Sequence, residues 1–207
     1  MKKGLIAFAA VFALALGGLY WFRTAAMPGH WTVAPSESMF AFGSVKNGFI
    51  AEVHTLSGIS GGADYTGEFS ISLDLTSTAT GVDIRDERMR DLFFETALYP
   101  VAVVNGTFNL ADFENMKVGE RKVLTLPVVI SLHGVEQTRD IEISVVRLAF
   151  DKMLVASTKP VMVEAAEFNL EEGIERLREA VGLDSIAAAA PVTFAIVFEG
   201  SALPEGD

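Results

Sequence analysis

Apolar and polar residues alternate along most of the chain beyond residue 36, with the two-residue period of a β-strand. In "GEFSISLDL", for example, Phe69, Ile71, Leu73 and Leu75 are separated by polar residues. About eight such runs follow one another, at residues 38–45, 48–56, 67–75, 100–110, 122–134, 139–148, 151–163 and 191–200. Consecutive strands without alternating helices predict an all-β fold, either an antiparallel barrel or a sandwich.

One interruption of this pattern has helical spacing. Residues 169–183 read "NLEEGIERLREAVGL", in which apolar residues recur every three or four positions, at Leu170, Ile174, Leu177 and Val181. Asn169 is placed to cap the start of the helix, with Glu172 three positions later, and Gly182 is placed to end it. The pattern predicts a short amphipathic helix between the last strands.

The other interruption is "GVDIRDERMRDLFFETALYP", residues 81–100. Asp83 can cap a helix here, and Asp86 and Arg90 have the spacing of an ion pair. The interleaved charges are Arg85, Asp86, Arg88, Arg90 and Asp91. They could form an acid–base pair or an anion site, but a structural clasp is favoured, in which they bond to neighbouring loops and to each other. The apolar face of the helix would then close one end of a barrel.

The N-terminus carries a second kind of signal. Residues 5–22 are 18 consecutive uncharged residues between Lys3 and Arg23. As a helix they would be about 27 Å long, close to the thickness of a bilayer core. Lys2 and Lys3 favour a cytoplasmic N-terminus, so the rest would be exported. We expect residues 1–26 to be an uncleaved inner-membrane anchor, or else a signal peptide cut after residues 24–26, and residues 27–207 to be one periplasmic domain.

Charge and cysteine content exclude several classes of function. Residues 27–207 hold all 27 acidic residues and 13 of the 16 Lys and Arg residues, so their net charge is near −14. Such a charge repels nucleic acid, and no nucleic-acid partner is expected. The chain has no cysteine, which excludes disulfides, thiolate metal sites and a cysteine nucleophile. The sequence gives no indication of oligomeric state.

Two further patterns could carry chemistry. Residues 58–62 fit G-x-S-x-G, which in a nucleophile elbow needs a strand-to-helix turn. A strand-like run follows here instead, so a hairpin loop is the favoured interpretation of Ser60. His30, His54 and His133 lack metal-ligand spacing. We expect no metal or cofactor, with His54 on a strand face and His133 at a strand end.

The aromatic residues are dominated by 15 phenylalanines, against three tyrosines and two tryptophans. Most of the phenylalanines lie in or beside the strand-like runs. A barrel lined with phenylalanine could hold an apolar chain. A filled core explains the same count equally well.

The order of motifs resembles the YceI-like family. The carrying residues are "WTVAPSESMFAF" at 31–42, Thr80 followed by the Arg-Asp, Phe-Phe and Tyr-Pro block of residues 81–100, "VLTLPVVISLHGV" at 123–135 and "VMVEAAEFNL" at 161–170. The resemblance covers roughly residues 30–200 in the correct order. The 81–100 block is its most specific part, and the chain looks like a membrane-tethered branch of the family.

The resemblance implies an extended antiparallel barrel of the lipocalin type, with about eight strands and a helix packed at one end. It implies an exported, non-catalytic protein that holds an apolar isoprenoid or isoprenoid quinone. Arg85 and Asp86 then form a clasp. Together with the aromatic pattern, the resemblance predicts ligand-contacting residues at Phe40, Phe42, Leu73, Phe93, Phe94, Tyr99 and Ile130. The alternatives are a periplasmic hydrolase using Ser60 and His54, and a structural envelope module with a solid core.

Overall fold

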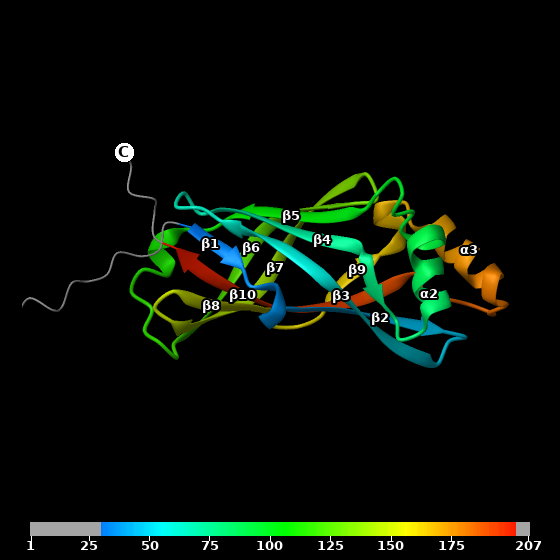
Figure 1. The fold of residues 1–207 in the computed structure, drawn as a ribbon, viewed down its shortest axis with the longest axis horizontal. Coiled ribbons are helices and arrows are strands. Elements are labelled where there is room, and N and C mark those ends of the chain that lie inside the picture. Colours follow the sequence, from blue (N-terminus) through cyan, green and yellow to red (C-terminus); the bar gives the residue numbers. More distant parts are fainter. Residues whose placement is uncertain (1–29, 202–207) are drawn as a thin grey trace, which may run out of the picture.

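The alternating runs form the strands of one antiparallel sheet in the computed structural model, which describes residues 30–201. The strands are β1 (His30–Val33), β2 (Met39–Lys46), β3 (Ile50–Ala63), β4 (Glu68–Ala79), β5 (Val101–Thr107), β6 (Arg121–Leu132), β7 (Val135–Ala149), β8 (Lys152–Ser157), β9 (Val161–Glu164) and β10 (Ala189–Ser201). Figure 1 shows them wound into an elongated barrel.

The sheet closes through β10, which pairs with β2 on one side and with β8 on the other. Two of the ten strands are extensions of others. β1 pairs with the part of β10 beyond β2, and β9 pairs with the part of β10 beyond β8. The result is an eight-stranded closed antiparallel barrel. The predicted all-β class and strand number are therefore confirmed, and the barrel rather than the sandwich is the architecture.

The period-two alternation identifies the residues that face the interior. On β4, Ile71, Leu73 and Leu75 are buried, and β7 buries Ile141, Ile143 and Val145 in the same way. Two clusters of buried apolar side chains cover the inner face of the barrel wall along its length. This burial is the main favourable term in the folding of such a domain.

Two short helices lie together at one end of the barrel, opposite β1 (Figure 1). α2 (Asp83–Arg88) continues into the π-helix η2 (Met89–Phe93), and α3 (Glu171–Val181) packs against η2. Gly173 allows the close approach, because a Cβ there would lie 2.9 Å from the Phe93 carbonyl oxygen. The 3-10 helices are η1 (Pro35–Glu37), η3 (Leu110–Asp112) and η4 (Ala165–Phe168).

The start of α3 differs from the prediction. Its N-cap is Leu170, which makes no side-chain cap, while Asn169 has φ 55° and ends η4. Asn tolerates this left-handed conformation better than most residues, so it serves here as a helix stop. The predicted stop at Gly182 is confirmed, with φ 65°. Asp83 likewise lies inside α2 rather than at its N-cap, which is Val82.

The glycine-rich segment 58–62 was expected to be a loop, and this prediction is wrong. The segment is part of β3. The glycines are needed because neighbouring backbones come close: a Cβ on Gly61 would lie 2.1 Å from the Ser70 carbonyl oxygen, and one on Gly62 would lie 2.2 Å from the Trp31 carbonyl oxygen. Glycine here allows β1 and β4 to pack against β3.

The anchor or signal segment predicted at residues 1–26 lies outside the described residues. Within residues 30–201, none of the helices has the length and hydropathy needed to cross a bilayer.

Candidate lipid-binding cavity

The interior of the barrel holds an elongated cavity of about 540 Å³. Its lining is overwhelmingly apolar and comes from strands all around the barrel. Ile130 and Phe194 face this interior yet remain only half-buried, because the cavity leaves one side of each uncovered. A tightly packed interior would bury such side chains completely.

Six of the seven residues predicted to contact a ligand line this cavity. They are Phe40, Phe42, Leu73, Phe93, Phe94 and Ile130. Tyr99 does not belong to the lining. Its ring instead packs on His133, with the ring centroids 4.3 Å apart, and it contacts Gly134 at the turn between β6 and β7. The structure therefore brings together the residues of the strands and η2, but places Tyr99 elsewhere.

The two ends of the cavity differ. At the β1 end, Trp31, Phe113 and Met116 are buried and cover the interior. At the helix end, several residues of the lining are also exposed to solvent: Val82, Ile84, Val181, Ala187 and Ala188. We call this group the mouth. The cavity thus opens beside α2 and α3.

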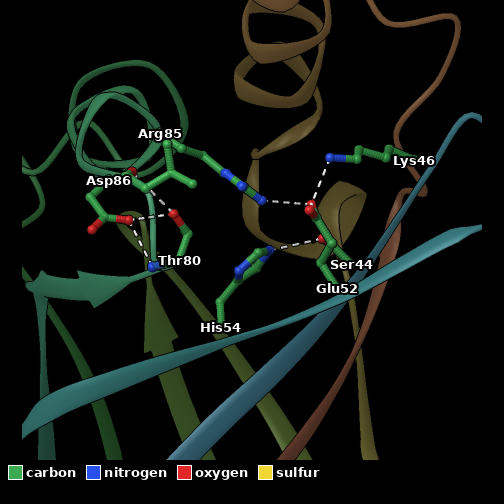
Figure 2. A network of polar contacts seen from close by, with 8 residues as sticks. Ser44, Lys46, Glu52, His54, Thr80, Arg85 and Asp86 are labelled. Carbon is green, nitrogen blue, oxygen red and sulfur yellow. Dashed lines mark hydrogen bonds and ion pairs between the residues drawn. The ribbon is translucent and has the colours of Figure 1, made fainter.

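A polar network lies inside the mouth and joins β2, β3 and α2 (Figure 2). Glu52 accepts bonds from Lys46 Nζ at 2.9 Å and from Arg85 Nη1 at 2.7 Å. His54 Nε2 lies 2.9 Å from Ser44 Oγ. The network results from the β2–β3 register, which pairs Ser44 with Glu52 and places His54 opposite Phe42.

The electrostatics of this network fix its charge states. Burial opposes ionisation of Glu52, but the bonds from Lys46 and Arg85 outweigh it and lower the pKa of its carboxyl. His54 is only 3% exposed. Burial, followed by the charge of Arg85, lowers the pKa of its imidazole. At neutral pH the site therefore contains a carboxylate paired with two cations, and a neutral histidine.

Asp86 holds the start of α2 to the end of β4. Its Oδ1 accepts a bond from the Thr80 backbone nitrogen at 2.7 Å and one from Thr80 Oγ1 at 2.5 Å. The hydroxyl bond is the main cause of the lowered pKa of this carboxyl. The expected ion pair between Asp86 and Arg90 is not among the ion pairs of the described residues. The clasp forms instead through Thr80 and through Glu52, which receives Arg85.

A second polar cluster fixes the segment after η2. The Glu95 carboxylate lies 3.1 Å from Arg176 Nη2 of α3 and 3.0 Å from His133 Nε2 of the β6–β7 turn. The bond from Arg176 is the largest contribution to the lowered pKa of Glu95. His133 has φ 51° and lies between two strands, so the prediction of a strand-end position is confirmed.

The structure does not bring Ser60 and His54 together. A bulge between Leu56 and Gly58 shifts the alternation of β3 by one residue, so that even-numbered residues face inward before it and outward after it. Ser60 is consequently exposed on the outer surface, whereas His54 is buried on the inner one. A hydrolase needs its nucleophile and base within hydrogen-bond reach. Within residues 30–201, His, Asp and Glu side chains form no group of three able to hold a metal ion.

The comparison with protein families covers most of the chain. A family model described as a YceI-like domain matches residues 31–198. The chain belongs to the YceI-like family. Its placement in a membrane-tethered branch of that family stays a prediction. The comparison with curated proteins gave no match.

Two solved structures show how this YceI-like chain compares. A polyisoprenoid binding domain from Saccharophagus degradans, implicated in plant cell wall breakdown, is 35% identical with a TM-score of 0.81, covering 82% of this chain and 98% of that one. BcnA from Burkholderia cenocepacia is 13% identical with a TM-score of 0.62, over 80% of this chain and 98% of its own. The similarity to BcnA, at 13% identity, shows a shared fold and nothing more.

Sequence reasoning on this YceI-like chain missed the polar residues that line the cavity just inside the mouth, above all Ser44, Lys46 and Glu52. No local motif marks them. The usable signal was the alternation itself: Ser44 and His54 are polar residues at inward positions of β2 and β3, and an inward polar residue in a strand needs a partner.

Proposed function

We propose that this protein is a non-catalytic lipid-binding barrel that holds an apolar isoprenoid chain, or the chain of an isoprenoid quinone. The observation that carries the proposal is the elongated apolar cavity, which opens beside α2 and α3. Its volume of about 540 Å³ is in the range of ligand pockets. The solid-core alternative would require this space to be filled by side chains.

The physical driving force is burial of apolar surface. An aliphatic chain gains about 25 cal/mol for each Å² removed from water, so burying ~400 Å² contributes roughly 10 kcal/mol before the costs of ordering the chain. The phenyl rings and aliphatic side chains of the lining supply this environment over most of the cavity, and its charged residues are confined to the helix end. The polyisoprenoid binding domain of Saccharophagus degradans, at 35% identity, supports the same ligand class.

We further propose that the barrel acts in the periplasm, held at the inner membrane by residues 5–22. The support is the uncharged 18-residue run between Lys3 and Arg23. In that position the protein would carry or buffer a lipid of the envelope.

The proposal is tested by mass spectrometry of organic extracts of the purified full chain. We expect a long, uncharged or weakly polar isoprenoid at close to one molecule per chain. A lipid-free preparation that also fails to take up an added prenyl hydrocarbon would contradict the proposal.

A further inference from the structure

The polar groups of the cavity lining are not spread along its length. Apart from the Trp31 indole, all are at the helix end, and the set is Ser44, Lys46, Glu52, His54, Arg85 and Arg88. A bound lipid therefore has an apolar environment for its chain and a hydrogen-bonding environment only inside the mouth. This distribution fits an amphipathic guest with one polar end.

Within this set, His54 is the residue with a buried polar atom that has no hydrogen-bond partner among residues 30–201. The residue is only 3% exposed, and the atom without a partner is Nδ1 of its ring. The other ring nitrogen, Nε2, is engaged by Ser44 Oγ. A buried polar atom without a partner is unfavourable, so native proteins almost always pair it. Since His54 lines the cavity, a guest can supply the partner.

The chemistry of the ring decides what that partner can be. The Ser44 hydroxyl can donate to Nε2 or accept from it. His54 Nδ1 can therefore either donate to a carbonyl oxygen or accept from a hydroxyl group. The imidazole is neutral, and it packs edge-on against Phe42, with the ring centroids 5.3 Å apart. It suits an uncharged headgroup next to an apolar chain.

The nearby charges do not favour an anion at this nitrogen. Lys46 and Arg85 are both bonded to the Glu52 carboxylate. An anionic headgroup would have to compete with that carboxylate and would be repelled by it. Arg88 also lines the cavity, and the ion pairs of the described residues do not include it. A phosphate headgroup would therefore bind at Arg88 and not at His54.

We infer that His54 Nδ1 hydrogen-bonds the uncharged oxygen headgroup, a hydroxyl or a carbonyl, of a lipid whose apolar chain fills the cavity. Ser44 sets the tautomer of His54 and acts as a positioning residue. The inference rests on the proposed function, since it requires the chain to be bound, but it makes a separate claim about the polar end.

The test compares three C20 probes on the full chain after removal of bound lipid: geranylgeraniol, the matching hydrocarbon without the hydroxyl, and geranylgeranyl monophosphate. We expect the alcohol to bind about 5- to 10-fold more tightly than the hydrocarbon, which corresponds to one hydrogen bond. His54→Phe should abolish this preference and leave hydrocarbon binding unchanged. His133→Phe, which changes a partly buried histidine outside the cavity lining, should keep it.

Binding of the hydrocarbon reports on the proposed function, whereas the alcohol-to-hydrocarbon ratio reports on His54 alone. Because His54→Phe could unfold the barrel, ¹⁵N NMR of the histidine rings in the unaltered protein gives a second readout. The Nδ1 signal of His54 should shift with geranylgeraniol and not with the hydrocarbon. An equal shift with both probes would overturn the inference. So would a preference that survives His54→Phe, or a monophosphate that binds most tightly and loses its advantage in Arg88→Gln.

Discussion

Two carboxylates, Asp86 and Glu52, attach α2 to the strands of the barrel. Asp86 joins α2 to Thr80 at the end of β4, and Glu52 joins α2 to β3 through Arg85. The sequence predicted that Arg85 and Asp86 form a clasp, but it did not predict their partners. Thr80 is six residues away and Glu52 is on another strand, so only the fold brings them together.

At this scale, we predict that Asp86→Ala destabilises the protein. Hydrogen bonds to a carboxylate contribute about 1.5–3 kcal/mol, and partial exposure of Asp86 reduces the effect to about 1–2 kcal/mol. For a domain of this size the melting temperature should fall by about 3–6 °C. Asp91→Ala changes an exposed acid of η2, which continues α2, and should have little effect. Equal melting temperatures for wild type and Asp86→Ala would exclude the clasp.

The same variant has a defined pH dependence. The pKa of Asp86 is lowered from its ordinary value of 3.8. The stabilisation is therefore present in full above that pH and is lost as the pH falls through the lower, folded-state value. Denaturant unfolding of wild type and Asp86→Ala should give a constant difference between pH 5 and 7, which narrows under acidic conditions. A difference in unfolding free energy that is as large at pH 2 as at pH 5 would show that the carboxylate charge is not its cause.

Among the elements, the strands were easier to predict than their ends and interruptions. The inward residues of β4 follow directly from period-two alternation, because one face of each strand must be buried. The helical pattern of α3 was equally clear. The strand through residues 58–62 was missed, because the need for glycine arises from the backbones of β1 and β4, which are distant in the sequence. The cap of α3 was misplaced because η4 uses Asn169 first.

The packing of α3 on η2 leads to a prediction for Gly173→Ala. In an exposed helix this change would stabilise by about 1 kcal/mol. Here the added Cβ would lie 2.9 Å from the Phe93 carbonyl oxygen and 3.1 Å from that of Leu92, so the helices must separate. Thermal unfolding should show a lower melting temperature for Gly173→Ala, and little change for Glu179→Ala on the exposed face. A higher melting temperature for Gly173→Ala would contradict this packing.

Considering the whole molecule, closure of the barrel creates both the cavity and its mouth. The composition could not distinguish a filled core from a lined channel, since the same phenylalanines serve either. The distinction depends on how far apart opposite strands lie, which closure of eight strands through β10 determines. Six of the predicted contact residues line the resulting cavity: four are at inward positions of strands, and Phe93 and Phe94 reach it from η2 and its C-cap at the end of the barrel.

The predicted position of the molecule in the cell rests on the sequence of residues 1–26. We predict that the native protein retains them and fractionates with the inner membrane, because the run from Leu5 to Phe22 is long enough to span it. N-terminal sequencing of the native protein checks this directly. A mature N-terminus at Met27 would show that the segment is a cleaved signal peptide. Replacing Leu14 with Arg should weaken membrane attachment, whereas Thr24→Arg should not.

The central claim, that the cavity binds an apolar chain, is tested most directly by two variants of one strand. Ile130→Glu puts a carboxylate into the lining, and Thr125→Glu puts the same group on the outer face of β6. The measurement is the uptake of a prenyl hydrocarbon per folded chain, with circular dichroism confirming the barrel. We expect Ile130→Glu to lose at least about tenfold in affinity, because the chain would have to desolvate the charge, and Thr125→Glu to bind like wild type. Equal uptake by all three proteins would contradict the account.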